Sequence, residues 1–266
     1  MLEITGLTKK FFGLTAVDDI TTRFERGQVS AIIGPNGAGK TTFFNLVAGT
    51  HPPTSGRIVF EGRDVTGMRP DHVARIGIAR TFQTTHLFDN ATVLDNLIVG
   101  HRLRTKSRLW DVLVNTRRLR DEERLCRDKA REALDFVGLS HVANRIAADI
   151  TQEERKRVAF ALALATDPRL LLLDEPAGGV NPEETVGLAA LIRKLVDHGK
   201  TVCLIEHKMD MIMRLADKIV VLNNGAKIAE GTPAEIRRDP QVIEAYLGAD
   251  IDTQAVTNAE VAHAAV

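Results

Sequence analysis

The chain has 266 residues, enough to bury a substantial core and to form one large domain or one domain with a subdomain. Its 35 Lys and Arg residues balance its 35 Asp and Glu residues, so no global charge favours a nucleic-acid partner. No apolar run reaches the about 18 residues of a membrane-spanning helix, and the N-terminus lacks the apolar region of a signal peptide. We therefore expect another chain to supply any membrane part of its assembly. The two cysteines, Cys126 and Cys203, lie far apart, which indicates packed, reduced thiols.

The first part of the chain alternates apolar and polar residues as β-strands do. In chain order, the pattern predicts strands between residues 2 and 24, a buried strand over 29–33, a helix over 41–48, a strand over 57–61 and a helix over 70–79. The glycine-rich stretch before residue 41 therefore connects a strand to a helix.

That stretch, residues 34–41, reads Gly-Pro-Asn-Gly-Ala-Gly-Lys-Thr and fits the phosphate-binding motif G-x-x-x-x-G-K-[ST]. The glycines let the backbone fold tightly around a polyphosphate, so that its N–H groups point inward. Lys40 can reach the β- and γ-phosphates, and the hydroxyl of Thr41 can bind Mg²⁺. The strand–loop–helix context favours a nucleoside triphosphate site over a glycine turn that binds nothing. The expected contacts come from Gly34, Pro35, Asn36, Gly37, Ala38, Gly39, Lys40, Thr41 and Thr42.

The pattern becomes helical from Thr92 to about Val137, and one apolar face ends at Gly138. Strands and helices then alternate again. The predicted elements are a helix over 157–166, a strand over 169–174, a helix over 183–198, a strand over 201–205, a helix over 208–216, strands over 218–222 and 226–230 around a turn at 223–225, and a helix that Thr232 caps and Pro233 begins.

Two acids, Asp174 and Glu175, follow four consecutive leucines at the end of a predicted strand. Open parallel sheets bind ligands at the carboxyl ends of their strands. Asp174 is therefore expected to hold Mg²⁺, and Glu175 to polarise the water that attacks the γ-phosphate. The alternative is a solvated strand end without a function.

The order of these motifs resembles that of an ATP-binding-cassette (ABC) ATPase over residues 1–248. The motifs are Gly34–Thr41, Gln83, a helical insert, Leu170–Glu175, Val180–Pro182 and Ile205–His207. Four segments more narrowly resemble the larger of the two ATPase subunits of branched-chain amino-acid importers. They are Ala79–Gln83, Ala163–Pro168, Ile205–Asp210 and Glu244–Gly248.

The resemblance implies an α/β fold of the P-loop NTPase class and ABC-ATPase type. It implies an N-terminal antiparallel β-subdomain, a central mixed sheet and a helical subdomain inserted at about residues 84–160 of a domain that spans residues 1–248. The remaining residues, 249–266, are small and polar, and we expect a disordered tail there.

The resemblance also implies ATP and Mg²⁺ as cofactors, and assigns roles to single residues. Gln83 would sense Mg²⁺ and water, and His207 would hydrogen-bond the γ-phosphate. Phe11 would stack on adenine with Val17 beside it. Phe12 stands where the relatives usually have glycine, so either ring could stack, and both could also be core residues. The implied catalytic set is Lys40, Gln83, Glu175 and His207, and the implied Mg²⁺ set is Thr41, Gln83 and Asp174.

The chain departs from the family where the partner subunit's ATP is expected to be contacted. Such ATPases pair head to tail, and each ATP faces a Leu-Ser-Gly-Gly-Gln signature of the other subunit, while the loop at Asn181 (the D-loop) also contacts that subunit. Here the signature position reads Ile150, Thr151, Gln152, Glu153 and Glu154. Both glycines are lost and two carboxylates face an anionic nucleotide. We expect a different ATPase as partner; the alternative is that the acids only favour a helix N-terminus.

Two surfaces are candidates for contacts at a membrane. Residues 88–97 combine exposed-looking apolar residues, among them Leu87, Phe88 and Val93, with a Thr92 cap, and are predicted to dock a membrane subunit rather than to form a core helix. Residues 101–131 contain eleven Lys or Arg and five Asp or Glu residues. This excess indicates a solvated helix face or contact with anionic lipid headgroups.

The sequence therefore predicts an ATP-hydrolysing subunit that powers an ABC importer of branched-chain or other hydrophobic amino acids, bound peripherally to the cytoplasmic face of the inner membrane. The implied partners are a second ATPase subunit, two transmembrane permease subunits and a solute-binding protein, without nucleic acid. The alternatives are another cargo (urea, amides or exported lipopolysaccharide), a soluble ABC protein that acts on DNA or ribosomes, and a binding module without turnover.

Overall fold

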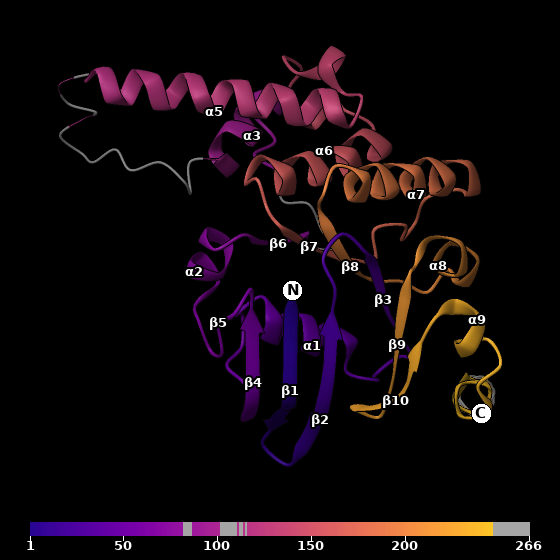
Figure 1. The fold of residues 1–266 in the computed structure, drawn as a ribbon. Coiled ribbons are helices and arrows are strands. Elements are labelled where there is room, and N and C mark those ends of the chain that lie inside the picture. Colours follow the sequence, from indigo (N-terminus) through magenta and orange to yellow (C-terminus); the bar gives the residue numbers. More distant parts are fainter. Residues whose placement is uncertain (82–86, 102–110, 112–113, 115, 247–266) are drawn as a thin grey trace, which may run out of the picture. The chain divides into compact units, whose positions relative to one another are not determined.

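The computed structural model describes residues 1–81, 87–101, 111, 114 and 116–246 (Figure 1). Its contacts divide the chain into two units. The first combines Met1–Gly67 with the described part of the chain from Cys203 onward, and the second is Met68–Val202. Strand β8 (Thr201–Ile205) begins in the second unit and ends in the first.

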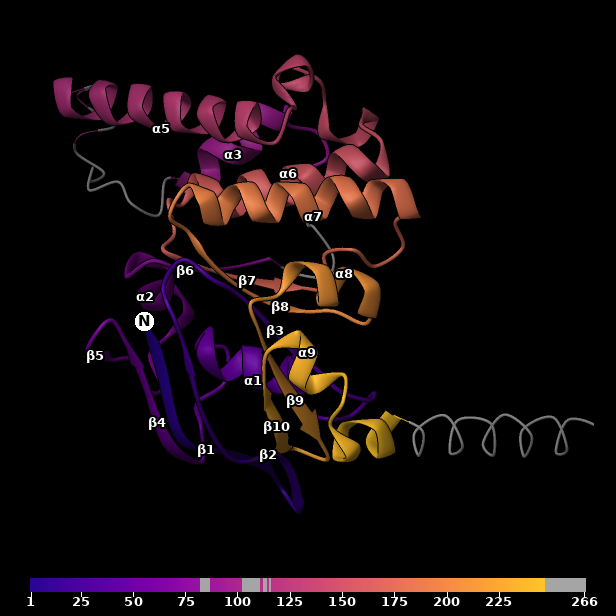
Figure 2. The same cartoon turned by 45° about the vertical axis from the view of Figure 1, so that its right-hand side comes forward.

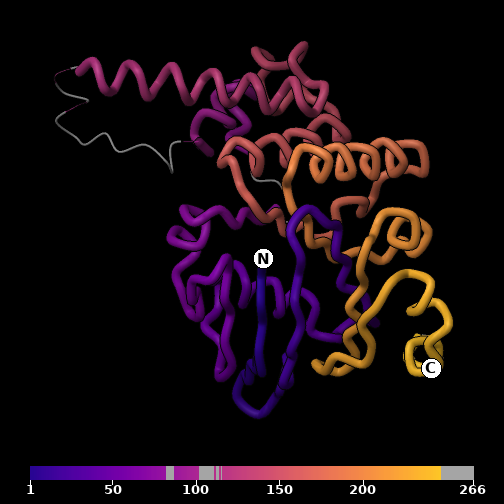
Figure 3. The backbone as a smooth tube through the Cα atoms, in the orientation of Figure 1, coloured from indigo at the N-terminus to yellow at the C-terminus, as the bar shows by residue number. Residues whose placement is uncertain are grey.

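An antiparallel sheet of four strands forms one layer of the first unit, in the order β2-β1-β4-β5. The strands are β1 (Leu2–Phe11), β2 (Leu14–Phe24), β4 (Ser55–Phe60) and β5 (Arg63–Asp64). Figure 3 shows the chain turning back on itself between β1 and β2, where Phe11 pairs with Leu14. Alternate residues of β1, among them Leu2 and Ile4, are buried, as expected for a half-buried strand. The predicted antiparallel β-subdomain is confirmed.

The first unit also contains strands of the six-stranded sheet in the order β10-β9-β3-β8. Strand β9 is parallel to β3 and antiparallel to β10, so this sheet is mixed, as predicted. The elements are β3 (Val29–Ile33), α1 (Lys40–Val47), α8 (Met209–Leu215), β9 (Lys218–Asn223), β10 (Ala226–Gly231) and α9 (Pro233–Ile236). Every residue of β3 is buried, including the polar Ser30, which agrees with a strand whose other residues are valine, alanine and isoleucine.

The second unit contains the parallel strand pair β6–β7 and most of the helices. Its elements are α2 (Pro70–Arg75), β6 (Ile78–Thr81), α3 (Val93–His101), α5 (Arg117–Phe136), two 3₁₀ helices (Ser140–Val142 and Ala147–Asp149), α6 (Gln152–Ala165), β7 (Leu170–Asp174) and α7 (Pro182–Asp197). Helices α3, α5 and α6 pack against one another (Figure 2). The buried face of α5 contains Cys126, Ala130 and Ala133, three residues of the predicted apolar face. Among the described residues, no helix is both long and apolar enough to cross a bilayer.

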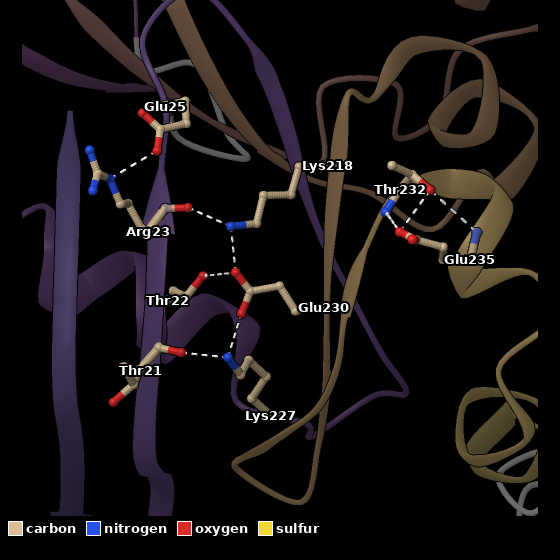
Figure 4. A network of polar contacts seen from close by, with 9 residues as sticks. All are labelled: Thr21, Thr22, Arg23, Glu25, Lys218, Lys227, Glu230, Thr232 and Glu235. Carbon is tan, nitrogen blue, oxygen red and sulfur yellow. Dashed lines mark hydrogen bonds and ion pairs between the residues drawn. The ribbon is translucent and has the colours of Figure 1, made fainter.

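The main differences from the predicted elements lie at two places. The helix predicted over 70–79 ends at Arg75, because Gly77 has φ of +104° and the chain then enters β6. The helix predicted from residue 157 begins at Gln152, where Thr151 and Glu154 form a capping box. The predicted Thr232 cap and Pro233 start of α9 are confirmed; Thr232 bonds the N–H of Glu235 (Figure 4). The tail predicted from residue 249 lies outside the described residues.

The two cysteines are free and buried, in α5 and β8, which agrees with the expectation of packed thiols. Burial raises the pKa of the Cys203 thiol, so this group stays protonated and unreactive at neutral pH.

Candidate functional site

Residues 34–39 form the predicted phosphate-binding loop between β3 and α1, in the first unit. A Cβ atom on Gly34 would lie 2.0 Å from the carbonyl oxygen of Leu222, and one on Gly39, at φ of +94°, would lie 2.3 Å from that of Ala16. Only glycine fits at these two positions. The N–H of Ala38 donates to the carbonyl oxygen of Pro35 (3.2 Å), which closes the turn of the loop. The backbone is therefore folded as the motif requires.

The ammonium group of Lys40 lies inside this loop. Its Nζ atom donates to the carbonyl oxygens of Gly34 (2.7 Å) and Pro35 (2.8 Å), and the residue is 6% exposed. The first turn of α1, which the structure describes in full, has no acidic residue, while Asn36, Gly37 and Thr41 are exposed. A cation and the N-terminus of a helix thus share one position, which suits a phosphate group.

The tip of the β1–β2 hairpin presents the aromatic residues predicted to contact adenine. Phe11 is half-buried and meets the ring of His51 edge-on at 5.6 Å, with the Nζ atom of Lys9 4.9 Å from its centroid. Phe12 is fully exposed and has φ of +51°, a rare conformation for a bulky residue. Val17 is fully buried in the core of the first unit. Phe12 is therefore fully accessible to a ligand and Phe11 partly so, whereas Val17 is a core residue.

His207 lies two residues after the end of β8 and is exposed, as a residue that reaches a ligand must be. Its neighbour Glu206 is 3% exposed, and the carboxylate accepts from the N–H groups of His207 (3.0 Å) and Lys208 (3.4 Å). Glu206 thereby shapes the turn that carries His207. The sequence analysis gave Glu206 no role, although a charged residue directly after a fully buried strand is a signal for such a turn.

In the second unit, Asp174 ends β7 as a buried carboxylate. Its Oδ2 accepts from the guanidinium of Arg80 at 2.6 Å, and its N–H donates to the hydroxyl of Thr81 at 3.4 Å. The other oxygen, Oδ1, is buried and has no hydrogen-bond partner among the described residues. Arg80 lies in the segment Ala79–Gln83, but the sequence did not predict that it would pair with Asp174.

These contacts bear on the predicted Mg²⁺. The described residues contain no cluster of three or more His, Cys, Asp or Glu side chains that could hold a metal ion. Mg²⁺ in nucleotide sites is usually held by one or two carboxylates together with phosphate oxygens and water. A single buried carboxylate with an unpartnered oxygen at Asp174 fits this mode. Gln83, the other predicted sensor of the ion, lies outside the described residues.

Glu175 has φ of +48°, a conformation that costs free energy for any residue except glycine. Its carbonyl oxygen accepts from the N–H of Gly178 at 3.0 Å, which closes a turn directly after the strand. Strained residues of this kind cluster at functional sites. Asn181 caps α7, because its side chain accepts from the N–H of Glu184 at 2.9 Å.

The four signature positions start helix α6. The hydroxyl of Thr151 accepts from the N–H of Glu154 (3.2 Å), and the Glu154 carboxylate accepts from that of Thr151 (2.7 Å). This second bond lowers the pKa of Glu154 against a small effect of burial. Glu153 forms an ion pair with Arg157 at 2.8 Å, and Gln152 is the first helical residue. Glu154 therefore caps the helix and Glu153 pairs within it, while the role of the segment toward a partner's nucleotide stays a prediction.

The surface features expected of the predicted docking segment are present in part, and docking itself stays a prediction. Phe88 is 64% exposed, and the predicted cap is present, because the hydroxyl of Thr92 accepts from the N–H of Asp95. Val93, however, was expected at the surface and is fully buried. It is the first residue of α3 and belongs to the buried face of that helix, together with Leu94 and Leu97. Leu87 is half-buried.

Comparisons with known proteins identify the family of the chain. The family model described as "ABC transporter" matches residues 17–178, and the model described as "Branched-chain amino acid ATP-binding cassette transporter" matches residues 226–252. The chain is 44% identical to the high-affinity branched-chain amino acid transport ATP-binding protein BraF of Pseudomonas aeruginosa, over 93% of this chain and 98% of the relative. It is 41% identical to the corresponding protein LivG of Salmonella typhimurium over the same shares.

Among solved structures, the ADP conformation of MJ1267, an ATP-binding cassette of an ABC transporter, matches with a TM-score of 0.82 and 33% identity. The match covers 93% of this chain and 98% of that one. The phosphate-binding loop, the strand-end acids and these similarities agree with one another, and the chain belongs to the ABC transporter family of ATP-binding cassettes.

Proposed function

We propose that this protein is the ATP-hydrolysing subunit that powers an importer of branched-chain or other hydrophobic amino acids. The observation that carries the proposal is the loop at 34–41, with the Lys40 ammonium held inside it and the first turn of α1 open to an anion. The amino-acid cargo is supported by the match at residues 226–252 and by the names of the relatives.

The loop would bind the phosphates of ATP, and the base would contact Phe11, with Phe12 as the alternative ring. Thr41, Gln83 and Asp174 would hold Mg²⁺, which neutralises charge on the β- and γ-phosphates when bound. Oδ1 of Asp174 supports this assignment, because it has no hydrogen-bond partner among the described residues and a buried carboxylate oxygen without a partner is costly.

Lys40, Gln83, Glu175 and His207 would form the catalytic set. Glu175 would accept a proton from the attacking water, and its strained backbone supports this role. His207, exposed at the end of β8, would donate a hydrogen bond to the γ-phosphate. The chain's contribution to catalysis is then positioning and charge stabilisation of an in-line attack.

The proposed assembly contains a second, different ATPase subunit, two transmembrane permease subunits and a solute-binding protein, with this chain bound peripherally on the cytoplasmic side. The segment at Phe88 would contact the permease, and its 64% exposure supports this. No observation favours urea, amides or lipopolysaccharide as cargo. Purification of the assembly from its native membrane, followed by mass spectrometry, would identify the partners.

The activity is tested by Glu175→Gln and Lys40→Ala. We expect Glu175→Gln to bind ATP as the wild type does and to release no phosphate, since it keeps a polar side chain and loses the base. Lys40→Ala should lose ATP binding. Glu183→Gln, an exposed acid in the first turn of α7, is the matched control and should be fully active. Wild-type turnover by Glu175→Gln would refute the general-base assignment.

A further inference from the structure

The hairpin of β9 and β10 contacts two other segments of the first unit through its turn. Asn224 and Gly225 occupy the two turn positions with φ of +47° and +83°, the mirror-image turn that hairpins favour. The N–H of Gly225 donates to the carbonyl oxygen of Ala38 in the phosphate-binding loop at 3.2 Å. The carbonyl oxygen of Gly225 accepts from the N–H of Asp18 in β2 at 2.8 Å. The N–H of Gly225 therefore contacts the phosphate-binding loop, and its carbonyl oxygen contacts strand β2.

The three segments meet backbone to backbone, without side chains between them. A Cβ atom on Gly225 would lie 3.2 Å from the carbonyl carbon and oxygen of Ala16. A Cβ atom on Gly39 would lie 2.3 Å from the same oxygen. Glycine on both sides of Ala16 is thus what lets the loop, β2 and the turn approach so closely.

The rest of the hairpin is attached to β2 as well, through the polar network in Figure 4. Nζ of Lys227 donates to the carbonyl oxygen of Thr21 (2.5 Å), and Nζ of Lys218 to that of Arg23 (2.6 Å). Glu230 forms ion pairs with both lysines and accepts from the hydroxyl of Thr22 (2.9 Å). The hairpin is therefore held along β2, and its turn cannot shift independently of that strand.

Strand β2 leads from Ala16 to the hairpin tip where Phe11 and Phe12 lie. At about 3.3 Å per residue, the four residues from Ala16 to Phe12 span at most about 13 Å. A ligand of the length of a nucleoside triphosphate can thus contact the loop and the tip together only if the two are held at a fixed separation.

We propose that Gly225 is a positioning residue for nucleotide binding: its turn fixes the phosphate-binding loop relative to the strand that carries the base-contacting aromatic residues. This inference rests on the proposed function, which assigns Phe11 or Phe12 to the base. The inference predicts different effects on the affinity for ATP and on the affinity for a free polyphosphate. A polyphosphate contacts only the loop, whereas ATP contacts both the loop and the hairpin tip and needs them at the right separation.

The test compares Gly225→Ala with Gly62→Ala. Gly62 occupies the same position of a similar two-residue turn between β4 and β5, with φ of +78°, but a Cβ atom there meets no atom within 4 Å. Both variants carry the same backbone strain, and only Gly225→Ala pushes on Ala16. Binding of ATP and of inorganic tripolyphosphate, each with Mg²⁺, is measured by calorimetry.

We expect Gly225→Ala to weaken ATP binding by about tenfold or more, with tripolyphosphate binding unchanged within about twofold, and Gly62→Ala to change neither by more than about twofold. Equal losses for ATP and tripolyphosphate in Gly225→Ala would overturn the inference, because the turn would then only support the loop. ATP binding as tight as in Gly62→Ala would also overturn it. Failure of the wild type to bind ATP at all would instead refute the proposed function, and the inference with it.

Hydrogen exchange of the wild type provides a second measurement that needs no variant. We expect ATP to slow exchange at the amides of Asp18 and Gly225, and tripolyphosphate to slow it at Gly225 only, since tripolyphosphate does not engage the strand. Equal protection of the Asp18 amide by both ligands would contradict the proposed coupling.

Discussion

The guanidinium of Arg80 donates to Oδ2 of Asp174 at 2.6 Å, in a pair of side chains that are 10% and 2% exposed. The two residues lie on the neighbouring parallel strands β6 and β7, where Arg80 pairs with Leu172, two residues before Asp174. The pair holds the proposed Mg²⁺ ligand in one orientation and leaves its second oxygen, Oδ1, available. Removal of one partner from such a buried ion pair leaves the other charge buried and uncompensated.

The first prediction concerns this pair. Arg80→Met should destabilise the protein by about 3–5 kcal/mol, because it leaves a buried carboxylate without its cation. The double variant Arg80→Met with Asp174→Leu should recover most of this loss, since apolar residues replace both charges. Urea unfolding measures both free energies. A single variant as stable as the wild type would mean that water reaches Asp174 and replaces the arginine.

The second prediction concerns coupling to a membrane subunit. Phe88→Asp should uncouple transport and leave basal ATPase activity unchanged, because Phe88 is 64% exposed and is the proposed contact of the permease. Leu125→Asp, at a 52% exposed position of α5, is the surface control and should affect neither property. Val93→Asp should unfold the protein, since Val93 is fully buried. Transport in proteoliposomes and phosphate release separate these outcomes; loss of folding in Phe88→Asp would favour a core role.

The third prediction concerns pH. Burial alone would raise the pKa of Glu230, but hydrogen bonds from Lys218, Lys227 and Thr22 hold it below its usual value of 4.5. A lowered pKa in the folded state means that the stabilisation is complete above the unfolded-state value and is lost as pH falls through the folded-state value. Glu230→Gln should therefore cost about 1.5–3 kcal/mol at pH 7, and the difference from the wild type should shrink in acid.

Urea unfolding at pH 7 and at about pH 3 checks this dependence. Glu25→Gln is the control, because Glu25 forms an exposed pair with Arg23 and should contribute less than about 1 kcal/mol at either pH. A cost for Glu230→Gln that stays constant between the two pH values would show that the carboxylate charge is not what stabilises the hairpin.

The sequence predicts those features that depend on neighbours along the chain. Strand β8 occupies the predicted residues 201–205, and the phosphate-binding loop lies between the predicted strand and helix. The start of α6 was predicted five residues late, because Gln152–Lys156 are polar and carry no apolar period. A capping box with Thr151 and Glu154, three residues apart, was the available signal.

Contacts between distant parts of the chain could not be predicted in this way. Arg80 and Asp174 are 94 residues apart, and nothing in their local pattern pairs them. The approach of Gly225 to Ala38 and Asp18 likewise joins distant segments, because Asp18 belongs to the four-stranded sheet and Gly225 to a turn of the six-stranded sheet. Val93 was predicted to be exposed because the residues around it in the sequence do not show whether its side chain faces solvent or the core.

The last prediction concerns the signature segment, where the glycines of the family are Gln152 and Glu153. At 4–6 Å and an effective dielectric constant near 20, one carboxylate beside a phosphate costs roughly 3–4 kcal/mol before screening. The ion pair of Glu153 with Arg157 and the capping role of Glu154 reduce this cost. A remaining cost of about 1.4 kcal/mol in the transition state would still slow ATP hydrolysis about tenfold. In a pair with a different subunit, this chain's ATP would meet an intact signature and be hydrolysed, whereas the partner's ATP would be hydrolysed slowly.

The isolated protein, which can pair only with itself, should therefore have weak ATPase activity. The combined changes Thr151→Ser, Gln152→Gly, Glu153→Gly and Glu154→Gln should raise it by about tenfold or more, although two glycines in the first turn of α6 will cost some stability.

The double variant Glu153→Gln with Glu154→Gln separates the effect of charge from the effect of the missing glycines. It removes both charges, keeps a side chain able to complete the capping box and adds no glycine. An increase in both variants assigns the effect to charge, and an increase only with the glycines assigns it to backbone access. Steady-state phosphate release is the measurement, and robust wild-type activity that neither variant changes would mean that the acidic segment is a tolerated variant and that the two sites are equivalent.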